Sequence, residues 1–222
     1  MQQFATPAPI TVVLDVPAGP IRFIAADRTD TVVELGPADP ARSRDAKAVE
    51  QTEVTFAEGV LRIVTDSAAH RLLGPSGAVE VTVRLPAGST VRAKSADGRL
   101  RGVGRLGDVS FEGARGTVKL DEASAARLAL QDGGIEVGRL TGPAEIGTQR
   151  GDITVAEAVR GTLDLSTKSG SISVGVTRGA SAALDAGTGH GRVHNALRNA
   201  DDVPAVTIRA TTANGDISAR TI

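Results

Sequence analysis

The sequence predicts an all-β chain: a single-stranded parallel β-solenoid, β-helix-like, with coils of about 18 residues and one short helix near the N-terminus. The first observation behind this prediction is a glycine that recurs in a polar turn and is followed by two apolar residues separated by one polar residue. These turn glycines are Gly98, Gly116, Gly134, Gly151 and Gly170. A constant step of this size is typical of stacked supersecondary units.

The second observation is that each repeat carries two pairs of apolar residues at positions i and i+2. Side chains at that spacing lie on one face of a strand, whereas the residue between them faces the other way. The pairs are Val109/Phe111 with Val118/Leu120, Leu128/Leu130 with Ile135/Val137, Ala144/Ile146 with Ile153/Val155, and Leu163/Leu165 with Ile172/Val174. An antiparallel sandwich or meander stays open as the alternative, although it does not require equal apolar positions at a constant step.

Residues 1–90 are interpreted as an atypical N-terminal cap with decorated coils, ahead of regular repeats over residues 91–222, all within a single domain 1–222. β-Branched and alternating residues predict strands over 10–16, 21–25, 31–35 and 78–85. The helix formers of residues 41–51 predict the short helix. Residues 54–56 and 60–64 predict a pair of strands around a turn at Glu58 and Gly59.

The spacing loosens after Val174. Residues 184–186 with 191–193 form one further unit, residues 199–204 form an insertion, and residues 206–208 with 215–217 close the chain. Because each coil of a solenoid lies above the last, we expect the coils to stack in chain order.

Composition limits the partners that we expect. Lys and Arg number 25 against 26 for Asp and Glu, so no excess charge attracts nucleic acid. Aromatic residues are 2% of the chain, which argues against base-stacking surfaces and aromatic-lined sugar sites. The sequence contains no cysteine and no apolar run long enough for a membrane span. Met1 to Pro7 lacks the basic and apolar regions of a signal peptide, so we expect a cytoplasmic protein.

Three segments share one phrase: Thr, two further residues, Gly, Asp or Ser, and Ile. They are residues 148–153, 167–172 and 212–217. In this phrase the chain resembles the adhesin-like β-strand-repeat family of unknown function, in particular its actinobacterial members. That family is similar in turn to the Toastrack-type solenoids that are linked to bacterial envelope-stress systems. The resemblance implies a repeat fold and a binding or scaffolding role.

Two glycine-rich stretches resemble nucleotide-binding loops. Gly102 to Gly107 matches G-x-G-x-x-G, but a strand follows where a dinucleotide site needs a helix. Gly187 to Gly191 lacks both the lysine of a P-loop and a following helix. We interpret both as turns between coils and predict no cofactor.

Other candidate sites have structural explanations. His190 and His194 are four residues apart but have no obvious further ligand, so we predict no metal site. Arg150-Gly151-Asp152 is an integrin-type tripeptide, interpreted as a turn in which Gly supplies a positive φ and Asp bonds the local backbone. The outward acids Glu136, Glu145 and Asp164 lie in successive coils, either as a carboxylate ladder or, as we prefer, as solvated surface charge.

The first functional hypothesis is a non-catalytic module that binds or scaffolds another macromolecule, and the partner that we expect is a protein. Its candidate surface is the loop of residues 68–77, with Arg71, Leu72 and Leu73 as partner-binding residues. Self-assembly through the ends of the solenoid is the alternative, because open β-coils present unpaired edges. A polysaccharide-active β-helix enzyme is the second alternative, and we predict no catalytic residues.

Overall fold

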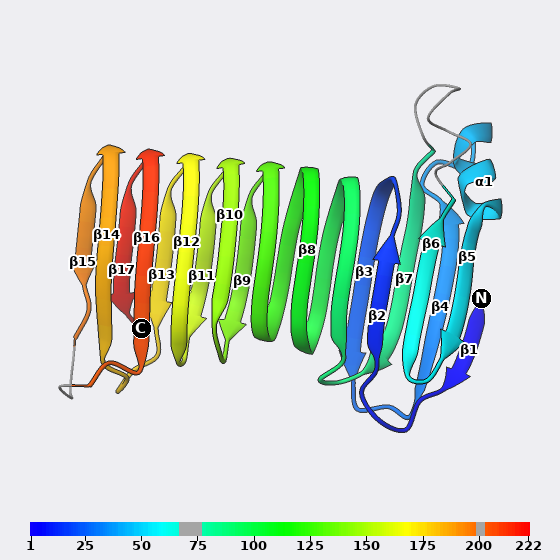
Figure 1. Ribbon diagram of the computed structural model, residues 1–222, viewed down its shortest axis with the longest axis horizontal. Coiled ribbons are helices and arrows are strands. Elements are labelled where there is room, and N and C mark those ends of the chain that lie inside the picture. Colours follow the sequence, from blue (N-terminus) through cyan, green and yellow to red (C-terminus); the bar gives the residue numbers. More distant parts are fainter. Residues whose placement is uncertain (67–76, 199–202) are drawn as a thin grey trace. The chain divides into compact units, whose positions relative to one another are not determined.

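The computed structural model describes residues 1–66, 77–198 and 203–222. Within these residues the chain is mostly β-strand, with one short helix near the N-terminus, as predicted (Figure 1). It divides into two compact units, Met1–Gly116 and Thr117–Ile222, which are described separately. The single domain over residues 1–222, with a change of character at residue 90, stays a prediction.

The first unit contains strands from both predicted regions of the chain. Its elements are β1 (Gln2–Ala5), β2 (Thr11–Asp15), β3 (Ala18–Ala26), β4 (Asp30–Pro37), α1 (Ser43–Glu50), β5 (Thr52–Ala57), β6 (Val60–Thr65), β7 (Val79–Pro86) and the first part of β8 (Thr90–Asp132). The predicted strands and the predicted helix are all present, and β1 is an additional strand that the sequence pattern did not indicate.

The first coil of the chain lies between two later ones. β2 pairs in parallel with β6 on one side and with β8 on the other, so that Val12 is opposite both Leu61 and Val91. β3 lies in the same way between β7 and β8, with Phe23 opposite Val83 and Gly102. Residues 11–26 are therefore inserted between segments that follow them in the sequence.

Part of the first unit departs from the predicted parallel arrangement. β1 with β4, β4 with β7, and β5 with β6 are antiparallel pairs. The turn between β5 and β6 has positive φ at Glu58 (51°) and Gly59 (75°), which suits the twist of a two-residue hairpin. The prediction of uniformly parallel strands is wrong for these three pairs. Only β5 and β6 are joined by a short turn, which favours antiparallel neighbours.

A buried carboxylate fixes the helix to the strands. Asp45 of α1 is 2% exposed, and its oxygens accept hydrogen bonds from the backbone amides of Asp39 (3.2 Å) and Ala78 (3.0 Å). These two amides flank β4 and β7, so one side chain ties the helix to both strands. Such pairing is what makes the burial of a carboxylate tolerable.

The second unit is built from two layers of parallel strands with the apolar side chains between them. Its elements are the end of β8, then β9 (Ile135–Leu140), β10 (Ala144–Arg150), β11 (Ile153–Ala158), β12 (Gly161–Ser169), β13 (Ile172–Val176), β14 (Ala182–His190), β15 (Val193–Ala196), β16 (Val206–Asn214) and β17 (Ile217–Thr221). One layer contains β10, β12, β16 and β14, and the other contains β9, β11, β13, β17 and β15.

Equivalent residues of successive repeats lie opposite one another. Ile153 is in register with Ile135 on one side and with Ile172 on the other, and Ile135 is in register with Val118. All sixteen apolar residues predicted to face inward are buried. The predicted period and the predicted inward faces are thus confirmed over these strands.

The coils of this unit do not stack in chain order. Ile217 of β17 lies between Ile172 of β13 and Val193 of β15, and Ile208 of β16 lies between Leu163 of β12 and Leu184 of β14. The C-terminal coil is therefore inserted between the two coils that precede it, and the expectation that it closes the stack is wrong. All these positions are aliphatic, so the local pattern fits either order.

The turn glycines form a ladder with the threonines of the repeated phrase. The hydroxyl groups of Thr148, Thr167, Thr212 and Thr188 donate to the carbonyl oxygens of Gly133, Gly151, Gly170 and Gly215, over 2.9 to 3.2 Å. Each threonine thus binds the turn of the adjacent coil. In the third repeat, the turn glycine is Gly133, with a φ of 141°. The prediction of Gly134 for this position is wrong by one residue.

Candidate functional site

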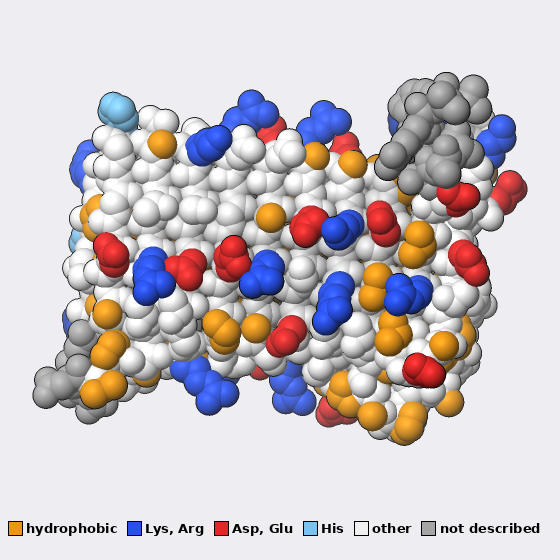
Figure 2. Space-filling view, viewed as in Figure 1, with side chains coloured by type: hydrophobic (Ala, Val, Ile, Leu, Met, Phe, Trp, Pro, Cys, Tyr) orange, Lys and Arg blue, Asp and Glu red, His pale blue; other side chains and the backbone are white. Residues whose placement is uncertain are grey.

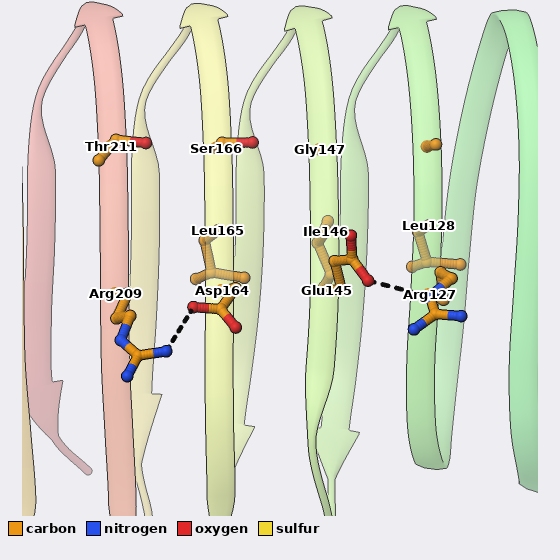
Figure 3. Close-up of a pocket in the computed structure, with 11 residues that line it drawn as sticks. Arg127, Leu128, Glu145, Ile146, Gly147, Asp164, Leu165, Ser166, Arg209 and Thr211 are labelled. Carbon is orange, nitrogen blue, oxygen red and sulfur yellow. Dashed lines mark hydrogen bonds and ion pairs between the residues drawn. The ribbon is translucent and has the colours of Figure 1, made fainter.

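A shallow groove of about 390 Å³ crosses the outer face of β10, β12, β16 and the end of β8 (Figure 3). Outward side chains on neighbouring parallel strands are aligned by the register, so the groove is built from two rows of residues that run across the strands. Its composition therefore depends on which residues fall in the same row.

The first row consists of small side chains. Ala129, Gly147, Ser166 and Thr211 lie opposite one another on β8, β10, β12 and β16. Gly187 of β14 continues the row next to Thr211. A row of small residues leaves the backbone close to the surface, so it forms a depression that a partner could enter.

The second row consists of charged side chains. Arg127 Nε lies 2.9 Å from Glu145 Oε2, and Arg209 lies 3.5 Å from Asp164 Oδ1. Asp185 of β14 continues this row next to Arg209. Figure 2 shows blue and red side chains following one another in a line over these strands, beside a band almost free of charged groups.

These ion pairs can exchange partners at little cost. The four side chains of Arg127, Glu145, Asp164 and Arg209 are between 51% and 77% exposed. Exposed pairs contribute about 0–1 kcal/mol to stability. A ligand that offers better-placed charges can therefore displace them without unfolding the strands beneath.

The predicted carboxylate ladder is only partly assembled. Glu145 and Asp164 are opposite one another on neighbouring strands, but each contacts a different arginine (Figure 3). Glu136 lies on β9 in the other layer, where it contacts Lys119 at 2.8 Å. The same kind of pair occurs in the first unit, where the Glu112 carboxylate accepts a hydrogen bond from Lys94 and raises the pKa of that ammonium group.

The glycine-rich stretches are parts of strands and turns. Gly102 to Gly107 lies within β8, and Gly187 to Gly191 covers the end of β14 and the following turn. Neither stretch precedes a helix in the described residues. Both therefore lack the helix N-terminus that a nucleotide phosphate needs.

The charged side chains of the Arg150-Gly151-Asp152 tripeptide contact the turns of adjacent coils. Arg150 contacts Asp132 at 2.9 Å, and Asp152 Oδ1 accepts a hydrogen bond from the amide of Ser171 at 2.7 Å. Asp216 makes the equivalent bond to the amide of Arg192 at 2.8 Å. These contacts agree with the structural interpretation of the tripeptide.

The remaining predicted residues give no further site. His190 ends β14 and His194 lies in β15, and both are exposed. In the described parts of the chain, no group of three His, Cys, Asp or Glu side chains is placed to hold a metal ion. Arg71, Leu72 and Leu73 lie outside the described residues, so their role stays a prediction. Across residues 1–66, 77–198 and 203–222, no helix has the length and apolar character of a membrane span.

Solved structures with related descriptions cover nearly the whole chain. A "putative adhesin" from Bacteroides fragilis has 13% identity and a TM-score of 0.46, with 98% of this chain and 95% of that chain covered. A "putative adhesin" from Parabacteroides distasonis has 13% identity and a TM-score of 0.44, with the same coverage. A "putative cell adhesion protein" from Clostridium sporogenes has 10% identity and a TM-score of 0.41, with 100% and 98% covered.

No curated protein matches the chain. The actinobacterial likeness finds no support in the three solved structures. The family comparison is direct, because the model described as Toastrack DUF4097 matches residues 69–220, which is more than half of the sequence. The chain therefore belongs to the Toastrack DUF4097 family.

Proposed function

We propose that the protein is a non-catalytic, adhesin-like binding module: a parallel β-solenoid that holds an extended segment of another protein in the groove across β10, β12 and β16. The observation that carries this proposal is the register of the two rows, which sets small side chains beside charges of both signs. Such a surface suits a flexible polypeptide in which basic and acidic residues alternate.

A protein segment fits this groove better than a glycan does. Sugar rings are commonly held on aromatic faces, and no aromatic residue lines the groove. Glu145 and Asp164 are each paired with an arginine, which favours a binding role over acid–base chemistry. We therefore keep the polysaccharide-active enzyme as the less favoured alternative.

Filling the groove tests the proposal. A Cβ at Gly147 would lie 3.3 Å from the Ser166 hydroxyl oxygen and 3.9 Å from the Ser166 carbonyl oxygen. A small shift of the hydroxyl group therefore lets Gly147→Leu project into the groove. The control is Thr154→Leu, which places the same outward leucine on β11 of the other layer. In a pull-down from native lysate, followed by a binding measurement with the captured protein, Gly147→Leu should weaken binding by about tenfold or more.

Equal binding by the two variants and the natural protein would refute the groove as the binding surface. The earlier candidate loop is tested in the same assay with Leu72→Asp/Leu73→Asp. A loss of binding in this variant alone would assign the partner to that loop. A cytoplasmic location and a link to envelope-stress systems belong to the proposal and are tested by localising the protein and identifying the captured partner.

Self-assembly is the second candidate function, and the end of the second unit favours it. Within the described residues, β14 pairs only with β16 and β15 only with β17, and every residue of β15 is exposed. Val193, an inward position in the other coils, is 45% exposed. An open edge of this kind can add a further strand. Light scattering should show dimers that Val193→Lys abolishes, and a monomer at all concentrations would exclude this function.

A further inference from the structure

A second hollow, separate from the groove, lies in the second unit near the C-terminal residues. Its volume is about 620 Å³, which is within the usual range for ligand sites. Three arginines line it: Arg178, Arg198 and Arg220. The rest of its wall is small or apolar, with Gly179, Ala196 and Leu197 among the lining residues.

The three arginines come from three segments that meet because the C-terminal coil is inserted. Arg220 of β17 lies opposite Gly175 of β13 on one side and Ala196 of β15 on the other. Arg178 follows β13, and Arg198 follows β15. The hollow therefore forms only when the inserted coil is in place.

Backbone contacts hold these segments together. The amide of Arg198 donates to Thr221 Oγ1 at 2.9 Å, and the amide of Ile222 donates to the carbonyl oxygen of Val176 at 3.0 Å. Both bonds join the inserted coil to a neighbouring segment. The arginine side chains thus project from a connected frame and not from separate loops.

The charges in this hollow are not compensated in the way that four other arginines of the unit are. Arg127, Arg139, Arg150 and Arg209 each lie within 4 Å of a carboxylate. Among the described residues, no carboxylate forms an ion pair with Arg178, Arg198 or Arg220. Three guanidinium groups around one hollow attract a multiply charged anion, and planar guanidinium groups match the oxygens of phosphate and sulfate in pairs.

We propose that this hollow binds a phosphate or sulfate group, carried by a small anion or by an anionic polymer. Because the site exists only in the folded unit, its ligand stabilises the inserted coil by mass action. This site is independent of the groove, so either one can fail without the other.

The test uses the full chain with any purification tag at the N-terminus, because Ile222 lines the hollow. Thermal unfolding is followed in inorganic phosphate, sulfate and chloride at equal ionic strength. The expected result is a Tm that rises with phosphate or sulfate concentration beyond the effect of chloride. Calorimetric titration with inorganic phosphate and with polyphosphate then gives the affinities. Tighter binding of polyphosphate per phosphate group points to a polymer, and equal binding points to a small anion.

Three single variants, Arg178→Gln, Arg198→Gln and Arg220→Gln, should each weaken phosphate binding by about tenfold or more. The control is Arg160→Gln, an exposed arginine whose Nε contacts the carbonyl oxygen of Thr141. Circular dichroism checks that every variant folds. The proposal is overturned if phosphate and sulfate act no differently from chloride, or if the control loses as much affinity as the three variants do.

The sequence also places Asp201 and Asp202 shortly after Arg198, outside the described residues. The variant Asp201→Asn/Asp202→Asn tests whether these carboxylates compete with the ligand. Phosphate binding by this variant but not by the natural protein would overturn the proposal, since the natural site would then be filled by its own chain. Equal binding by both supports it.

Discussion

At the scale of the residue, the repeated phrase is explained by contacts between adjacent coils. Its threonine lies three residues before the turn glycine, is buried, and donates to the glycine carbonyl of the neighbouring coil, as Thr167 does to Gly151 at 3.1 Å. Its aspartate accepts a hydrogen bond from a backbone amide of the next turn, as Asp152 does from Ser171. The phrase therefore recurs because each copy satisfies polar groups of the copy beside it, which agrees with a structural role.

We predict that Thr167→Val destabilises the protein. Valine has the same shape but leaves the Gly151 carbonyl oxygen without this donor, so the cost should be about 0.5–1.5 kcal/mol in urea unfolding. Ser95 provides the comparison, because it stands three residues before Gly98 but its buried Oγ has no partner in the described residues. Ser95→Ala should leave stability unchanged or raise it. Equal losses in both variants would contradict this explanation of the phrase.

A second residue-scale prediction concerns the turn glycines. Gly151 has a φ of 141°, and a Cβ there would lie 2.2 Å from the carbonyl oxygen of Gly133. Gly151→Ala should therefore cost about 1–3 kcal/mol from backbone strain, with the steric overlap in addition. In Gly187→Ala the new Cβ meets nothing within 4 Å, and φ is not positive. This control should match or exceed the natural stability, and a comparable loss in both would show that the stacked turns are not constrained.

At the scale of the element, the sequence predicts the coils but not their order. The inward positions follow from the i, i+2 spacing, which is local, and all sixteen are buried. The stacking order of the coils does not follow from local spacing. Leu163, Ile208 and Leu184 share one register, and each would fit beside either of the others. Insertion of the first and last coils could not be predicted for this reason.

The groove could not be predicted for a related reason. Ala129, Gly147, Ser166 and Thr211 are unremarkable in their own strands and become a site only through the register. Arg178, Arg198 and Arg220 come together only through the inserted coil. The carboxylates Glu145 and Asp164 were identified from the period alone, because they lie in successive regular coils.

The inserted coil should control the stability of the coil outside it. Ile217 is 1% exposed, so Ile217→Ala should cost about 2–5 kcal/mol. Since β15 pairs with β17 and β14 with β16, hydrogen exchange should accelerate over residues 182–196. Val193→Ala, in the same register but 45% exposed, is the control and should have a much smaller effect. Unchanged exchange over residues 182–196 in Ile217→Ala would contradict the dependence.

At the scale of the whole molecule, the open question is how cooperatively the chain unfolds. Two compact units can be distinguished, but β8 includes residues on both sides of their boundary in the sequence. In repeat proteins each coil depends mainly on its neighbours, so cooperativity is carried from one coil to the next by their pairing. A division at Gly116 would require β8 to break within a continuous strand.

We therefore predict one unfolding transition for residues 1–222. In calorimetry, the measured enthalpy should equal the van't Hoff enthalpy. Phe23→Ala in the first unit and Ile153→Ala in the second remove fully buried side chains. Each substitution should lower the same Tm, because destabilising one coil destabilises all coils that unfold together with it. Two transitions, of which Phe23→Ala moves one and Ile153→Ala the other, would instead show that the chain consists of two domains.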